Sequence, residues 1–115
     1  MKQPTPNVTL KDVERVVSRD FPAENCAEIL ELIDAVEVRE NARVILACLK
    51  NSGGDLVRLK NELRNAEGYW RETISEAEYP GYSKKVFRSA DLTAEDRQGI
   101  YKKDWEQYSE WLGSE

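Results

Sequence analysis

The chain has 115 residues and a mass of 13.2 kDa, which is the size of one ordinary domain. Hydrophobic residues make up 40% and charged residues 34% of it, so neither the disordered nor the membrane class fits. The net charge of -5 argues against general binding to a phosphate backbone, and a histidine count of 0 excludes most catalytic triads and catalytic zinc sites. We expect one helical domain over residues 1–115, with residues 1–7 flexible.

Two helices are predicted in the first third of the chain. The first runs from Asn7 to Ser18, with Thr9 as a cap and Asp12 favourably placed at its positive end. Its apolar face consists of Leu10, Val13, Val16 and Val17. The second runs from about Ala23 to Val36, and its apolar positions are Cys26, Ile29, Leu30, Ile33 and Val36. We expect this second helix to be well buried.

The third and fourth helices are expected to form the centre of the fold. The third, from about Arg39 to Asn51, is apolar on nearly all sides, and Arg43 and Lys50 lie close together on the remaining side. A glycine turn separates it from the fourth helix, from Leu56 to about Glu78. Seven apolar residues form one seam along this long helix: Leu56, Leu59, Leu63, Ala66, Trp70, Ile74 and Ala77. The seam favours a bundle core, with homodimerisation through it as the alternative.

The last third contains an irregular segment and a final helix. Residues 79–90 have turn residues first and no sustained period, which predicts a loop with one short helical turn. The final helix is capped at Thr93 and reaches about Leu112. Its apolar stripe, expected to close the core, consists of Tyr101, Trp105, Tyr108 and Leu112. The fold class is therefore all-α, a single-domain bundle of about five helices with a long fourth helix.

The residues that could support catalysis are few. Cys26 and Cys48 lie on apolar helices without a histidine to activate them, so we expect buried, reduced thiols and no disulfide. No metal site, no cofactor and no catalytic residue is predicted. The one mixed cluster of ionisable groups consists of Glu76, Glu78, Tyr79, Tyr82, Lys84 and Lys85. Asp104 and Arg97 lie near the apolar arc of the last helix, where we expect each to pair at the rim with a tyrosine hydroxyl or an opposite charge.

The segment after the fourth helix is the most suggestive part of the sequence. It combines aromatic and basic residues and has no acid between Tyr79 and Ser89, although the chain is acidic elsewhere. Such a mixture is typical of protein interfaces and of sites for single-stranded nucleic acid. The candidate partner-binding residues are Tyr79, Tyr82, Lys84, Lys85, Phe87 and Arg88. The alternative is that the aromatic rings pack on the core while the cations remain solvated.

The functional hypothesis that follows is a small cytoplasmic protein-interaction module, such as an adaptor, accessory subunit or inhibitor. The net charge disfavours a nucleic-acid partner, and no apolar stretch is long enough for a membrane span or a signal peptide. A monomer is favoured and a homodimer is possible. The alternative is a small enzyme or ligand-binding domain that uses carboxylate and tyrosine groups in a pocket between helices. The sequence does not identify the partner or ligand.

Overall fold

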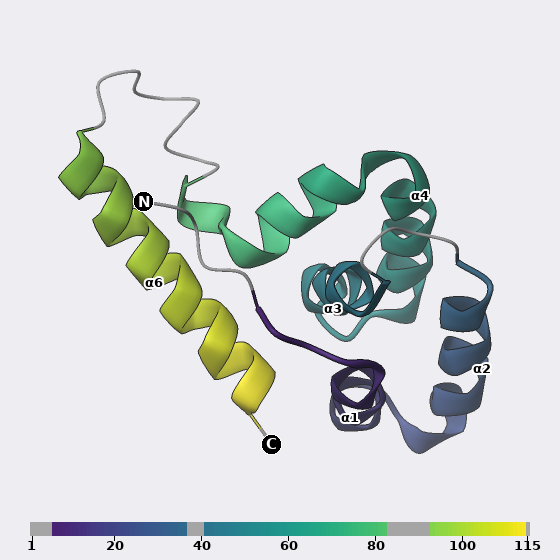
Figure 1. Cartoon of the computed structure of the whole chain (residues 1–115). Coiled ribbons are helices and arrows are strands. Elements are labelled where there is room, and N and C mark those ends of the chain that lie inside the picture. Colours follow the sequence, from purple (N-terminus) through teal and green to yellow (C-terminus); the bar gives the residue numbers. More distant parts are fainter. Residues whose placement is uncertain (1–5, 37–40, 83–92, 115) are drawn as a thin grey trace.

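The computed structural model describes residues 6–36, 41–82 and 93–114. The regular structure in these ranges is helical, and they contain no strand (Figure 1). The helices are α1 (Leu10–Asp20), α2 (Ala23–Asp34), α3 (Asn41–Ser52), α4 (Leu56–Glu78) and α6 (Ala94–Gly113). The predicted all-α bundle with a long fourth helix is confirmed. Of the N-terminal residues expected to be flexible, 1–5 lie outside the described residues, and Pro6 is buried.

Local side-chain chemistry sets the start of the first and last helices. Thr9 is the N-cap of α1, and its N–H donates to the Asp12 carboxylate at 2.9 Å. Thr93 is the N-cap of α6, and its hydroxyl accepts the Asp96 N–H at 3.1 Å. A capping residue lies outside the helix, so α1 begins at Leu10 rather than at the predicted Asn7.

Helix α3 lies at the centre of the molecule, between α1 and α4 (Figure 1). Its residues from Val44 to Leu49 are all buried, as expected for a helix that is apolar on nearly all sides. The α4 seam packs into the same core, and its buried members are Leu59, Leu63, Ala66, Ile74 and Ala77. The seam is thus covered within a single chain, in agreement with the bundle-core interpretation.

Two expectations for the N-terminal helices are wrong. Leu10 was expected on the apolar face of α1, but it is 56% exposed because it forms the first turn, beyond the edge of the core. Helix α2 was expected to be well buried, but within it only Ile29 and Ile33 are. This helix lies at the outer edge of the bundle against α1, so only one narrow stripe faces the core (Figure 1).

Helix α4 is bent. Tyr69, which follows Gly68, has the non-helical angles φ -129° and ψ 43°. The Thr73 hydroxyl donates to the Tyr69 carbonyl at 3.2 Å and so satisfies a backbone acceptor at the bend. The apolar seam continues on both sides, since Ala66 and Ile74 are buried. The second half of the helix therefore runs toward α6 without losing its contact with the core (Figure 1).

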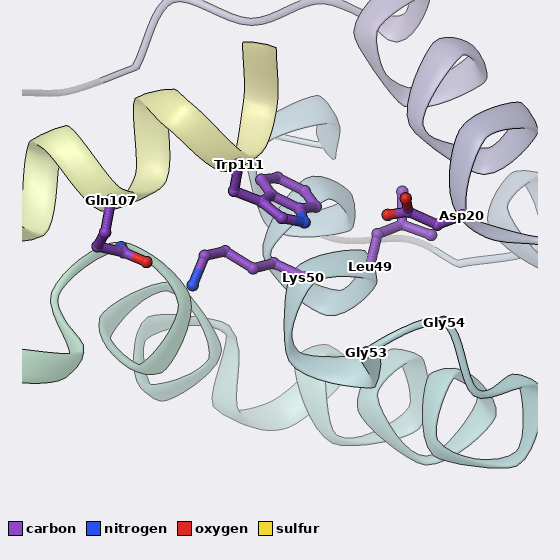
Figure 2. Close-up of a pocket in the computed structure, with 7 residues that line it drawn as sticks. All are labelled: Asp20, Leu49, Lys50, Gly53, Gly54, Gln107 and Trp111. Carbon is purple, nitrogen blue, oxygen red and sulfur yellow. The ribbon is translucent and has the colours of Figure 1, made fainter. Parts of the chain in front are cut away.

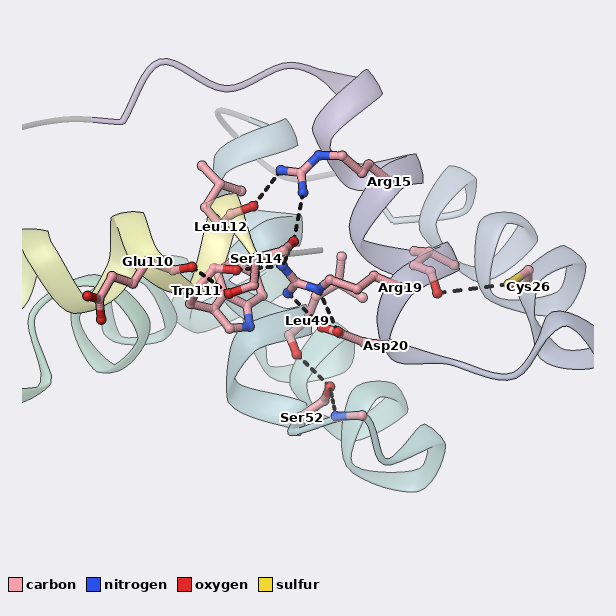
Figure 3. A network of polar contacts seen from close by, with 12 residues as sticks. Arg15, Arg19, Asp20, Cys26, Leu49, Ser52, Glu110, Trp111, Leu112 and Ser114 are labelled. Carbon is pink, nitrogen blue, oxygen red and sulfur yellow. Dashed lines mark hydrogen bonds and ion pairs between the residues drawn. The ribbon is translucent and has the colours of Figure 1, made fainter.

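Two arginines of α1 hold the end of α6. The Arg15 guanidinium donates to the Leu112 carbonyl, and Arg19 donates to the carbonyls of Trp111 and Ser114 (Figure 3). The last carbonyls of a helix lack the amide partners that a further turn would supply, although the Trp111 carbonyl also accepts the Ser114 N–H at 3.4 Å. The helix dipole makes this end negative. Cations from a neighbouring helix therefore stabilise the end of α6 and fix it against α1.

An ion pair in the core joins α3 to α4. The Arg43 guanidinium donates twice to the Glu78 carboxylate, at 2.9 and 2.8 Å, and the Glu78 side chain is only 3% exposed. Beside this pair, burial and the Glu78 charge raise the pKa of Tyr79 to about 12 and raise the pKa of Tyr108 as well. The Tyr108 hydroxyl is buried and has no hydrogen-bond partner among the described residues. The centre of the bundle is thus partly polar.

Breaking this ion pair should destabilise the fold strongly. Arg43→Leu leaves the Glu78 carboxylate buried without its cation, and we expect the free energy of unfolding to fall by about 3–5 kcal/mol in urea denaturation. Replacing both residues with leucine should recover a large part of that loss, because no buried charge then remains unpaired. A single variant as stable as the wild type would show that the pair does not support the core.

The fold should lose stability in alkaline solution through Cys48. Burial, with the Glu62 charge, raises the pKa of this thiol from 9.0 to about 12. The unfolded chain therefore releases the proton above about pH 9 while the folded chain keeps it, so stability falls between pH 9 and 12. Denaturation of wild type and Cys48→Ala at each pH should show their difference in unfolding constant changing about tenfold per pH unit. A difference independent of pH would contradict the assignment.

Candidate functional site

The predicted partner-binding segment is described only in its first part. Tyr79 is the C-cap of α4 and is 5% exposed, so its ring is part of the core and offers almost no surface to a partner. Tyr82 is half-buried at the edge of the core. The other candidates, Lys84, Lys85, Phe87 and Arg88, lie outside the described residues. Partner binding by this segment stays a prediction.

A buried carboxylate of α6 fixes the helical turn at Pro80–Tyr82, which follows α4 and was predicted within residues 79–90. Asp104 is 4% exposed, and its two oxygens accept the N–H groups of Gly81 and Tyr82, each at 2.9 Å. Bonds from N–H groups to a carboxylate are charge-assisted and hold backbone firmly. A Cβ atom at Gly81 would lie 2.7 Å from Asp104 Oδ1, so the close approach requires glycine.

The expectation for Asp104 is therefore corrected. The side chain was expected at the rim, bonded to a tyrosine hydroxyl or an opposite charge, but it is buried and bonded to backbone amides. The sequence pattern gives the face of a helix, whereas the amides come from a turn that only the tertiary fold brings to that face. Arg97, which was considered with it, is exposed.

The fixed turn presents Tyr82 to a tyrosine of α6. The rings of Tyr82 and Tyr101 have centroids 4.8 Å apart at an angle of 50°, and Tyr79 meets Tyr101 edge-on at 6.4 Å. Burial, followed by the hydrogen bond with Tyr82, raises the pKa of Tyr101. Tyr82 and Tyr101, both half-buried, form a surface that we call the tyrosine platform. Tyr82 was predicted from the sequence as a site residue, whereas Tyr101 was expected in the core.

The mixed cluster considered for catalysis is not assembled among the described residues. The Glu78 carboxylate is held by Arg43 inside the core, whereas Glu76 is exposed on α4. Tyr79 is buried, and Tyr82 packs against Tyr101 with the two rings tilted. Lys84 and Lys85 lie outside the described residues. Glu78 and Tyr79 thus lie together in the core, whereas Glu76 is exposed and Tyr82 lies at the edge of the core.

A cavity of about 470 Å³ lies between α1, the turn after α3, and α6 (Figure 2). It is lined by Asp20, Leu49, Lys50, Gly53, Gly54, Gln107 and Trp111. The half-buried Lys50 side chain extends below the Trp111 indole (Figure 2). Burial lowers the pKa of Lys50, and the charges of Asp104 and Glu76 partly oppose this shift.

This cavity was not predicted from the sequence, although Arg43 and Lys50 gave one signal. The two cations share the one polar side of an otherwise apolar helix. The structure shows that the two cations differ, since Arg43 binds Glu78 whereas Lys50 reaches the cavity. The sequence could not reveal that α6 covers this side of α3 and supplies the tryptophan.

Disrupting the Asp104 anchor should loosen the turn at Gly81 and Tyr82. Asp104→Asn replaces one accepting oxygen with an amide that cannot accept, and we expect a loss of about 1–3 kcal/mol in the free energy of unfolding. Gly81→Ala should be destabilising too, because its Cβ would contact the carboxylate. Urea denaturation would measure both, with the exposed Glu106→Gln on α6 as a matched control. Unchanged stability in both variants would contradict the anchor.

Comparison with known proteins gives no independent evidence about this site. No protein-family model matches the sequence, and no curated protein or solved structure is significantly similar to it. Within the described ranges, no group of three or more potential metal ligands occurs, and none of the helices is long and apolar enough to cross a membrane. A functional proposal for this chain therefore rests on its own geometry and sequence.

Proposed function

We propose that the protein is a small interaction module that binds an acidic surface of a partner protein through the tyrosine platform and the basic segment after it. The observation that carries the proposal is the Asp104 anchor. It fixes the backbone of Gly81 and Tyr82 and so holds a half-buried aromatic pair at the point where the basic segment begins. Rigid, partly exposed tyrosines provide contact area at little entropic cost, which makes them common at interfaces.

Charge favours an acidic protein as the partner. The residues Lys84, Lys85 and Arg88 follow the platform in the sequence, and no acid lies between Tyr79 and Ser89. Complementary charge mainly increases the rate and specificity of association, whereas aromatic anchors contribute most of the affinity. A nucleic acid is disfavoured because the whole chain carries a net charge of -5. We also propose that the protein is cytoplasmic and monomeric.

The alternative of a carboxylate- and tyrosine-based enzyme has less support. Its buried carboxylates are already engaged, because Glu78 binds Arg43 and Asp104 binds two backbone amides. A catalytic acid or base has to reach a substrate, and these oxygens face the interior of the protein. A ligand-binding role for the cavity is a separate question.

The proposal predicts that Tyr82 is an anchor of the interface. A partner would be identified by mass spectrometry after co-purification and then purified for binding measurements. Tyr82→Ala should raise the Kd at least about tenfold, because an interface anchor contributes most of the affinity. Tyr69→Ala removes a ring that is 65% exposed on α4 and is the matched control, with little expected change.

Further measurements separate this proposal from its rivals. Added salt should raise the Kd, and the partner should lose affinity when its acidic residues are neutralised. Thermal melts would verify that Tyr82→Ala is folded. A folded Tyr82→Ala protein that binds as tightly as the wild type would refute the proposal. So would a partner that contacts the module through a basic surface, or the absence of any specific partner.

A further inference from the structure

We infer that the cavity below Trp111 binds a small aromatic carboxylate. Its volume of about 470 Å³ lies within the range of small-molecule sites, and its lining comes from three separate helical elements (Figure 2). This inference does not depend on the proposed partner protein, because it concerns a different face of α6.

Lys50 supplies the cationic group. It has no ion pair within 4.0 Å and no hydrogen bond to another described side chain, although it is half-buried. Asp104, the nearby buried carboxylate, already accepts two backbone N–H groups. A partly desolvated ammonium group without a close counterion favours an anion beside it.

The other charged residue that lines the cavity does not neutralise the positive charge of Lys50. Asp20 is the acid in the cavity wall, and Arg19 binds its two oxygens at 2.7 and 3.0 Å. The same guanidinium lies over the Trp111 ring, 5.1 Å from its centre. The Arg19–Asp20 pair is thus close to neutral. Asp104 and Glu76, whose charges act on Lys50, lie outside the lining, so the ammonium of Lys50 is the unpaired charge of the lining itself.

Trp111 and the glycine turn determine the shape of the ligand. The Trp111 indole is half-buried, with Arg19 over its ring and Tyr108 packed against it at a centroid distance of 5.6 Å. The part of the indole that lines the cavity is apolar, which favours an aromatic ring over a compact ion such as phosphate. Gly54 has a φ of 82°, and a Cβ atom on it would lie 3.2 Å from the Asp20 carbonyl. Glycine therefore keeps this turn close to α1 and leaves no side chain to fill the cavity. A planar ring with one carboxylate matches the stacking surface and the single cation.

The inference can be tested with benzoate on the full-length chain. The indole N–H signal of Trp111, assigned among three tryptophans by a Trp111→Phe variant, should shift as benzoate is added. Benzamide has the same ring without the charge, and acetate has the charge without the ring, so both should bind at least about tenfold more weakly. Benzoate should also raise the pKa of Lys50, measured from its side-chain NMR signals, because an anion stabilises the ammonium form.

The deciding variant is Lys50→Gln. It should raise the Kd for benzoate at least about tenfold, whereas the matched control Lys103→Gln, which neutralises an exposed lysine of α6, should change it less than about twofold. Lys50→Met retains the apolar part of the side chain and provides a second variant if glutamine disturbs folding. Benzoate that binds Lys50→Gln as well as the wild type would overturn the inference. No shift of the Trp111 signal at millimolar benzoate would overturn it too.

Discussion

The burial of α3 is the constraint on which the rest of the structure depends. A helix with apolar residues on nearly all sides has to be covered from several directions at once, because each exposed apolar surface carries a free-energy cost in water. Helix α4 covers one side and α1 another, and six consecutive residues from Val44 to Leu49 become buried as a result. The bend at Tyr69 then lets α4 continue along the core and reach α6.

The polar groups around this core fix the positions of the helices relative to one another. Apolar packing alone tolerates small shifts of one helix along another, whereas a bidentate ion pair or a carboxylate that binds two amides has one geometry. Arg43 and Glu78 fix α4 relative to α3, and Asp104 fixes α6 relative to the end of α4. Arg15 and Arg19 fix the other end of α6 against α1.

Helix α6 gives the molecule two different surfaces. Near its middle, Tyr101 meets Tyr82 and forms the aromatic platform proposed to contact a partner. Near its end, Trp111 covers Lys50 and closes one side of the cavity. Both features combine a side chain of α6 with one from an element distant in the sequence. Proper docking of α6 is therefore a common requirement of both proposals, although each involves its own residues.

The helices and most of the core could be predicted from the sequence alone. The capping residue Thr93, the apolar seam of α4 and the central position of α3 were all predicted, because caps and helical periodicity are local properties. Tyr82 was predicted as a partner-binding residue, and Asp104 was predicted to lie near the apolar arc of the last helix. The packing of the helices in three dimensions was needed to show what these two residues contact, that α2 lies at the edge, and that Lys50 shares a cavity with Trp111. Those outcomes depend on how helices distant in the chain pack together, and a periodic pattern gives the face of a helix but not its neighbour.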